Sequence, residues 1–248
     1  MTAQTPVSIG ILVYPDMNAL DAIGPAEIFA GSRHVNLHLV WKTATPVRTS
    51  AGWRVVPTTA FPKAPQMDVF CVPGGSGQIA LMDDEEVLDF LRKQATGARY
   101  VTSVCTGALV LGAAGLLNSR RATTHWMSHD QLALFGAIPV HERVVVDGNR
   151  ITGGGVTAGM DFALVVLAEL FGVEEADAVQ LSAEYDPQPS RAVGRPGLAN
   201  PALVEQVRAQ NAARQGRRLQ VSTQAAERLR GVPLRKDGRP ANADRRQH

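Results

Sequence analysis

Short apolar runs recur along the chain, and several of them are apolar on consecutive residues rather than on alternate ones. Consecutive apolar residues are typical of strands that are covered on both faces, as in a parallel sheet between two layers of helices. We therefore predict strands at 7–14, 36–42, 67–73, 100–104, 121–126, 143–148 and 150–155.

Segments with helical periodicity fill the intervals between these runs. The last such segment begins after Thr157, a suitable N-cap, and ends at Gly172, which suits the C′ position. The predicted helices cover residues 24–32, 84–97, 106–117, 128–135 and 157–172.

Strands that alternate with helices indicate an α/β domain with a mainly parallel sheet. One pair of strands is expected to be an exception. Asp147 and Gly148 form a hairpin signal, so we predict that residues 143–146 and 150–152 pair antiparallel.

The chain changes character after Tyr185. Residues 186–201 are rich in Pro and Gly and are predicted to be a linker. Beyond it we expect an amphipathic helix over 201–220 and a shorter helix over 222–231, which Ser222 would cap. The predicted divisions are an α/β domain over 1–187, the linker and C-terminal helices over 188–232, and a disordered tail over 233–248.

Composition is that of an ordinary globular protein, with 45% hydrophobic and 19% charged residues among 248. The net charge of +2 conceals an asymmetry, since residues 1–190 carry 12 Lys and Arg against 19 Asp and Glu, whereas residues 191–248 carry 13 against 4. A basic tail raises the question of nucleic acid binding.

We expect no signal peptide, because the start lacks a basic n-region and a cleavable apolar region. We also expect no membrane span, because no apolar stretch approaches ~18 residues.

The chain has two cysteines, which are too few for a disulfide framework and match no zinc-binding spacing. The expectation is a reduced, soluble protein of the cytoplasm. Cys71 stands in the middle of a predicted strand among apolar residues, so a structural role is expected for it. Cys105 stands at the end of another strand.

Ligands in open α/β sheets bind outside the carboxyl ends of the strands. This rule selects the loops that follow Tyr14, Val72, Val104 and Ile151. The second of these loops, PGGSG, could expose successive N–H groups to an anion or oxyanion, but it is also an ordinary turn sequence. Neither PGGSG nor TGGGVTAG, the Gly-rich loop after Ile151, has the signature of a P-loop or a dinucleotide site. Nucleotide binding is therefore not expected.

Cys105 lies where the strand over 100–104 passes into the helix over 106–117. A tight turn of this kind presents the side chain outward, and the first N–H groups of the helix, beginning with Thr106, favour a thiolate. The geometry predicts a lowered thiol pKa and a strained backbone at Cys105. Gly107 would allow close approach, as in other nucleophile elbows. The alternative is a buried cysteine that acts as a small hydrophobic residue.

Two further residues could act on this thiol. Asp21 either caps a helix that starts near Pro25 or faces Cys105 as a general acid and base. His125 follows a predicted strand, so it could activate the thiol or serve only as a hydrogen-bonded structural residue. No set of His, Asp and Glu has the spacing of metal ligands. Two other histidines are expected at the surface, His129 and His141.

These residues and their order resemble the ThiJ/PfpI superfamily of glutamine-amidotransferase-like proteins. The segments LDAIGP, DVFCVPGGSG and SVCTGALVLGAAGLLNSRRATTHW carry the resemblance, which covers about residues 7–185. It implies a flavodoxin-like three-layer sandwich with a mainly parallel sheet and a cysteine nucleophile elbow, here followed by a C-terminal helical extension. Within the superfamily, VHERVVVDGN and TGGGVTAGMDFAL make the chain most similar to the isocyanide hydratases.

This resemblance implies a homodimeric enzyme, without cofactor or metal, that converts an isocyanide and water to an N-substituted formamide. The family nucleophile falls on Cys105, which would carry a thioimidate intermediate. Asp21 falls on an aspartate of these hydratases, where many other members keep a glutamate, and would be the acid and base. Thr106 falls on the family threonine, and its N–H would line a polar cradle together with Gly74 and Gly75.

Other functions stay open at this stage. A glyoxalase, deglycase or thiol stress sensor of the same superfamily would favour Glu at position 21. A transcription regulator would join the cysteine domain to a helix-turn-helix domain longer than the two helices predicted here, so no nucleic acid partner is expected. A non-catalytic binding module is a further alternative. His125 matches a superfamily histidine by its spacing from Cys105, which does not decide its role.

Overall fold

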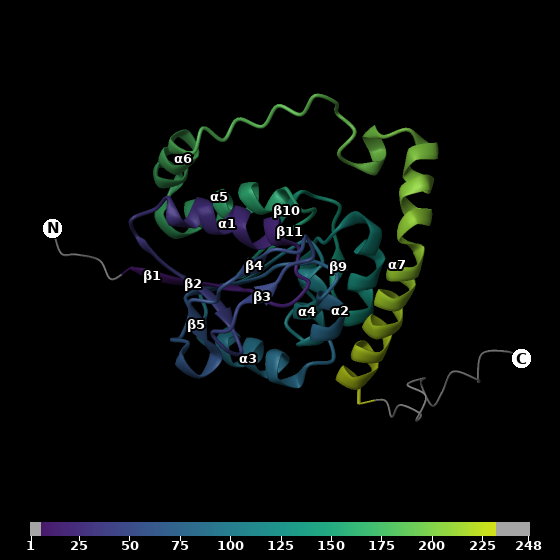
Figure 1. The fold of residues 1–248 in the computed structure, drawn as a ribbon, viewed down its shortest axis with the longest axis horizontal. Helices are drawn as coiled ribbons and strands as arrows, with labels where there is room; N and C mark the ends of the chain where they lie inside the picture. The colour runs from purple at the N-terminus through teal and green to yellow at the C-terminus, as the bar shows by residue number, and fades with distance from the viewer. Residues whose placement is uncertain (1–5, 232–248) are drawn as a thin grey trace, which may run out of the picture.

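The fold is built on a seven-stranded sheet with the order β10-β11-β7-β6-β1-β2-β5 (Figure 1). The protein is represented by a computed structural model that describes residues 6–231. Neighbouring strands run parallel except for β10 and β11, which form a hairpin. The strands of the sheet are β1 (Val7–Leu12), β2 (Val35–Trp41), β5 (Thr59–Ala60), β6 (Val69–Val72), β7 (Tyr100–Val104), β10 (Val144–Asp147) and β11 (Arg150–Gly153).

Helices cover both faces of this sheet, so the molecule has three layers (Figure 1). The pair α1 and α5 pack together on one face with α6, whereas α3 and α4 lie on the other, and α7 packs along η2, α4 and α2. The helices are α1 (Ala19–Ala30), α2 (Gln78–Leu81), α3 (Glu85–Ala95), α4 (Gly107–Ala113), α5 (Ala158–Phe171), α6 (Val173–Ser182) and α7 (Pro201–Leu229). The 3₁₀ segments are η1 (Phe61–Lys63), η2 (Trp126–Phe135) and η3 (Pro196–Leu198).

The α/β class, the mainly parallel sheet and the hairpin at Gly148 are confirmed. Short elements went unpredicted, because two to four residues carry too little periodicity to be recognised. The α6 helix was also missed, since the sequence analysis ended the preceding helix at Gly172 without starting another. The missed strands are β3 (Val47–Arg48), β4 (Arg54–Val55), β5 and β9 (Ile138–Pro139), and the missed short helix is α2.

The strand predicted over 121–126 is mostly absent. Only β8 (Arg121–Ala122) forms, and it pairs with β9 outside the main sheet. The next two residues use their polar groups elsewhere: the Thr123 N–H donates to the Thr152 hydroxyl at 2.9 Å, and the Thr124 hydroxyl donates to the Cys105 carbonyl at 2.7 Å. These bonds take the place of a strand ladder.

The prediction of two C-terminal helices is wrong. One continuous helix, α7, covers Pro201–Leu229, with Asn200 as its N-cap. Ser222 does not start a second helix, because its hydroxyl is buried and donates to Gln131 of η2 at 2.9 Å. A serine inside a helix is tolerated where the side chain finds such a partner. The tail predicted to be disordered over 233–248 lies outside the described residues.

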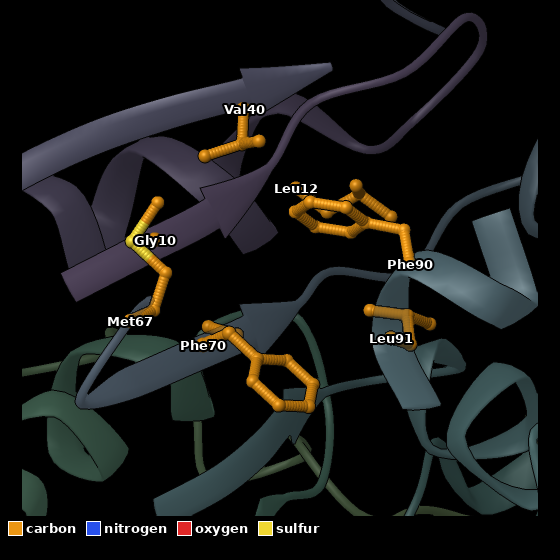
Figure 2. Close-up of a pocket in the computed structure, with 8 residues that line it drawn as sticks. Gly10, Leu12, Val40, Met67, Phe70, Phe90 and Leu91 are labelled. Carbon is orange, nitrogen blue, oxygen red and sulfur yellow. The ribbon is translucent and has the colours of Figure 1, made fainter. Parts of the chain in front are cut away.

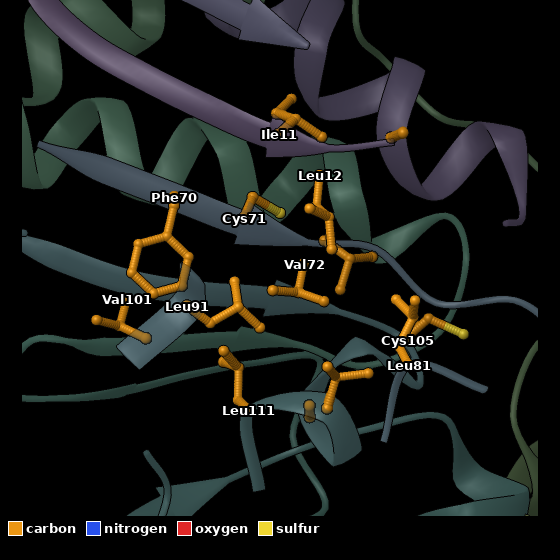
Figure 3. Close-up of a cluster of buried hydrophobic side chains, with 14 of the residues drawn as sticks. Ile11, Leu12, Phe70, Cys71, Val72, Leu81, Leu91, Val101, Cys105 and Leu111 are labelled. Atoms are coloured by element: carbon orange, nitrogen blue, oxygen red, sulfur yellow. The ribbon is translucent and has the colours of Figure 1, made fainter. Parts of the chain in front are cut away.

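The core fills the space between the sheet and both helix layers. Figure 3 shows Phe70, Cys71 and Val72 of β6 among buried side chains of neighbouring elements, with Cys105 at one end of the cluster. Burial raises the pKa of the Cys71 thiol to about 12, which fits the structural role expected for it. A void of about 10 Å³ lies between β1, β2, β6 and α3, near Gly10 and Met67 (Figure 2). It is about the size of one water molecule, so it is a packing gap and not a substrate site.

The close approach of α4 to the end of β6 makes a prediction about Gly107. A Cβ there would lie 1.8 Å from the Val72 carbonyl oxygen, whereas a Cβ at Gly216 of α7 would meet nothing within 4 Å. Gly107→Ala is therefore expected to lower the free energy of unfolding by about 1–3 kcal/mol or more. Gly216→Ala is expected to raise it by up to about 1 kcal/mol, because alanine favours a helix over glycine.

Urea denaturation of the two variants measures this difference in the unfolding midpoint. Equal midpoints for Gly107→Ala and the wild type would show that α4 can move away from β6 at no cost.

Candidate active site

Cys105 occupies the turn between β7 and α4 and has a left-handed backbone, with φ of 55°. This positive φ confirms the strained elbow that the sequence predicts, since such values are uncommon outside glycine. Both backbone polar groups of Cys105 are held: its N–H donates to the Gly153 carbonyl at 3.0 Å, and its carbonyl accepts from Thr124. Contacts to two other segments therefore fix the strained residue in place.

Asp21 lies in the first turn of α1 and is completely buried. It is not the cap of this helix, because the side chain of Asn18 accepts from the Leu20 N–H and the helix begins at Ala19. One carboxylate oxygen of Asp21, Oδ2, accepts from the Gly74 N–H at 2.9 Å. The other oxygen, Oδ1, is buried and has no hydrogen-bond partner within residues 6–231.

Asp21 and Cys105 form a pair of buried acids. Burial raises the pKa of Asp21 to about 7, although contacts with the Cys105 thiol and the Gly74 N–H oppose the change. Burial also raises the pKa of the Cys105 thiol well above its usual value, and the charge of Asp21 raises it further. Two acids that interact this closely titrate as one unit. The pair therefore holds at least one proton near neutral pH.

The expected lowering of the thiol pKa is thus wrong for the resting site. The Thr106 N–H does favour the thiolate of Cys105, as the elbow geometry predicts. Its effect is outweighed by desolvation and by the neighbouring carboxylate, because both disfavour a second negative charge in a buried place.

The loop after β6 packs directly on this pair. The Gly75 N–H donates to the Thr106 hydroxyl at 3.2 Å, and the Gly74 N–H is taken by Asp21. A Cβ at Gly74 would lie 2.6 to 2.8 Å from Thr106 and Asp21, so glycine is needed there for the loop to come this close. The two glycine N–H groups proposed as substrate donors are therefore engaged within the site, where they position Asp21 and Thr106.

Among the described residues, His125 makes no hydrogen bond to the Cys105 thiol, and its charge is not among the causes that shift the thiol pKa. It precedes η2, where its Nδ1 accepts from the Met127 N–H at 3.4 Å. Burial lowers the pKa of His125 to about 4, and the charges of Arg218 and Arg214 lower it too, so the ring is neutral. His129 is buried rather than exposed, because one ring nitrogen bonds to the Val140 carbonyl at 2.9 Å.

Two residues of the site were missed by the sequence analysis. Tyr14 is fully buried after β1, and its hydroxyl donates to the Pro73 carbonyl at 2.7 Å, which anchors the loop that carries Gly74. Arg218 is buried on α7 and reaches the carbonyl of Gly75. No local pattern marks either one, since a tyrosine at a strand end and an arginine on a polar helix are common.

Among the described residues, no cluster of His, Cys, Asp and Glu is arranged to hold a metal ion. None of the helices there is both long enough and apolar enough to cross a bilayer.

A buried cysteine elbow at the carboxyl edge of this sheet defines a class of protein. The sequence model of the DJ-1/PfpI family matches residues 7–169, and the chain belongs to that family. It is 52% identical over 223 residues to the isonitrile hydratase of Pseudomonas putida. These residues cover 90% of this chain and 98% of the relative. A crystal structure of a ThiJ/PfpI family protein from Pseudomonas syringae superposes with a TM-score of 0.86 and 40% identity, over 88% of this chain and 91% of the other.

A regulator shares part of the sequence. The HTH-type transcriptional regulator GbdR of Pseudomonas aeruginosa is 30% identical over 185 residues, which cover 71% of this chain and 50% of the regulator. The match spans only half of that protein.

The burial of Asp21 makes stability depend on pH. Its pKa is about 7 in the folded protein and near 3.8 in the unfolded chain, so the unfolded chain loses this proton first as pH rises. The free energy of unfolding is expected to fall between pH 4 and pH 7, by at most about 4 kcal/mol from this group. Asp21→Asn removes the effect, so the variant should gain stability over the wild type as pH rises.

Urea titrations at several pH values, with exposed Asp130→Asn as the control, measure this difference. A constant gap between Asp21→Asn and the wild type from pH 4 to pH 7 would contradict the raised pKa.

Proposed function

We propose that this protein is an isocyanide hydratase, which adds water to an isocyanide and releases the N-substituted formamide. The observation that carries the proposal is the pair of Asp21 and Cys105: a carboxyl group with a pKa of about 7, buried beside a cysteine on a strained elbow. The 52% identity to a protein named isonitrile hydratase, another word for isocyanide hydratase, supports the same activity.

The first step forms a thioimidate. The Cys105 sulfur attacks the terminal carbon of the isocyanide and forms a C–S bond, while that carbon receives a proton from Asp21. The shared proton of the pair makes this possible: Asp21 accepts the thiol proton as the thiolate forms and then delivers it to the carbon. The Thr106 N–H stabilises the thiolate until the bond is made.

The second step releases the product. Asp21, now a carboxylate, takes a proton from water, whose oxygen adds to the thioimidate carbon. Asp21 passes this proton to the nitrogen. As the C–S bond breaks, the added hydroxyl becomes the carbonyl of the formamide and its proton goes to the sulfur, which restores the thiol. Asp21 Oδ1 suits this exchange, because it is the carboxylate oxygen that has no hydrogen-bond partner among the described residues. A buried carboxyl group with a pKa near the working pH serves well as both acid and base.

The proposal extends to three properties that the resemblance implies. We propose a homodimer, a cytoplasmic location, and catalysis without a cofactor. Sedimentation equilibrium measures the first, and turnover by metal-free protein in the presence of a chelator measures the last.

Cys105→Ala tests the nucleophile. Turnover of an alkyl or aryl isocyanide, followed as formamide by mass spectrometry, is expected to be lost. The matched control is Cys71→Ala, because Cys71 is the other buried cysteine and lies within β6 away from the elbow.

Asp21→Asn keeps the size of the side chain but cannot transfer the proton, so kcat/KM is expected to fall about 10²–10⁴-fold.

Equal activity of Cys105→Ala and the wild type would end the covalent mechanism. A wild type that is inert toward isocyanides but turns over dicarbonyl substrates would place the chain with another activity of the family.

His125→Asn tests the remaining histidine. Asparagine can accept from the Met127 N–H as His125 does, so the start of η2 should survive. Because the ring is neutral and makes no hydrogen bond to the thiol among the described residues, kcat/KM is expected to stay within a few-fold of the wild type, with an unchanged pH profile. A loss of 100-fold or more with intact folding would instead make His125 part of the proton transfer.

A further inference from the structure

One arginine of α7 points inward. Arg218 is only 4% exposed, whereas its neighbour Arg217 lies at the surface. Its guanidinium donates to three groups: Nε to the side-chain oxygen of Gln78 at 2.9 Å, Nη1 to the Ser128 hydroxyl at 3.4 Å, and Nη2 to the Gly75 carbonyl at 3.3 Å. These partners belong to α2, η2 and the loop after β6, so one side chain joins three segments to α7.

The contact with Gly75 leads to the nucleophile. The same residue that gives its carbonyl to Arg218 gives its N–H to the Thr106 hydroxyl at 3.2 Å. Thr106 follows Cys105 and supplies the N–H that favours its thiolate. Two successive hydrogen bonds therefore connect α7 to the residue beside Cys105, through Gly75, whose φ of 133° is a conformation that favours glycine.

Arg218 also brings a positive charge to a site that otherwise gathers acids. These acids are Asp21 of α1 and the Cys105 thiol, and the hydroxyl of Tyr14 lies beside them with a pKa that burial raises well above its usual value. The charge of the guanidinium lowers the pKa of both the Cys105 thiol and the Tyr14 hydroxyl. Burial lowers the pKa of Arg218 itself, but an arginine stays charged in proteins.

Two basic groups complete the surroundings of this guanidinium. Arg214 of α7 is exposed, and its positive charge lowers the pKa of Arg218 by repulsion. His125 is kept neutral, in part by Arg218. The positive charge that a Cys–His pair would place on the histidine is thus provided here by an arginine from the C-terminal helix.

We propose that Arg218 is a positioning residue of this site, which fixes Gly75 against Thr106 and supplies the buried positive charge that faces Cys105 when its thiol loses the proton. The kinetic part of this proposal rests on the proposed hydratase function, whereas the electrostatic part concerns the thiol alone. Arg218 lies beyond residues 7–169, the range that the family model matches, so α7 adds this residue to a site built by the family fold.

The first experiment measures the thiol directly. Alkylation of Cys105 by iodoacetamide is followed by mass across pH in the full-length protein, with Cys105→Ala as the blank. The comparison is Arg218→Gln against Arg217→Gln, which removes a charge from the same helix at an exposed position. We expect about tenfold slower alkylation near neutral pH and a profile moved to higher pH for Arg218→Gln only, since one pKa unit changes the thiolate fraction tenfold.

The second experiment uses turnover of an aryl isocyanide. Arg218→Gln should lower kcat about tenfold or more with little change in KM, because the guanidinium donates to Gln78, Ser128 and Gly75 and is proposed to act through Gly75 and the thiol. Arg218→Lys keeps the charge but not the forked donor group, so it should keep the alkylation profile and still lose kcat through Gly75. Thermal melting of each variant confirms that the compared proteins are folded.

The outcomes separate the two proposals. Identical alkylation profiles of Arg218→Gln and Arg217→Gln would overturn the electrostatic role, and wild-type kcat in Arg218→Lys would overturn the positioning of Gly75. If Arg218→Gln does not fold, Arg218→Lys alone tests the electrostatic role. This variant keeps the positive charge, so a shift of its alkylation profile away from the wild type would overturn that role. A wild type without isocyanide turnover, whose alkylation nevertheless depends on Arg218, would reject the hydratase function and keep the role of Arg218 at the thiol.

Discussion

The site depends on the burial of two acids at one point. Asp21 and Cys105 are both removed from water, and neither has a basic side chain as a direct hydrogen-bond partner in the described structure. The pair therefore holds at least one proton near neutral pH, which the proposed proton delivery to an isocyanide requires. The surrounding features serve this pair: Gly74 binds one carboxylate oxygen, Thr106 favours the thiolate, and Tyr14 anchors the loop between them.

Much of this arrangement could be predicted from the chain. The change from a consecutive apolar run to small residues at Cys105 located the elbow, and its positive φ follows from that tight turn. The rule that ligands bind at the carboxyl ends of strands brought Asp21 and the PGGSG loop to the same edge. Both inferences concern local sequence and topology, for which the chain carries enough information.

Other features depended on tertiary contacts that no local pattern records. The thiol pKa was misjudged because the elbow supplies one favourable N–H, whereas burial and Asp21 act from outside the segment. The break predicted before Ser222 was wrong because Gln131 offers that hydroxyl a partner. Arg218 stands on a largely polar helix with no local signal of burial, and only the path of α7 along η2 and α2 turns it inward.

The position of α7 along the chain affects when the site can assemble during synthesis. Synthesis makes Cys105 long before Arg218, which lies 113 residues later. Until α7 has been made and has packed against η2 and α2, Gly75 lacks the donor that this helix provides. The proposed nucleophile is therefore made before the contacts around it are complete. Folding of the site has to wait for a segment that is distant in sequence.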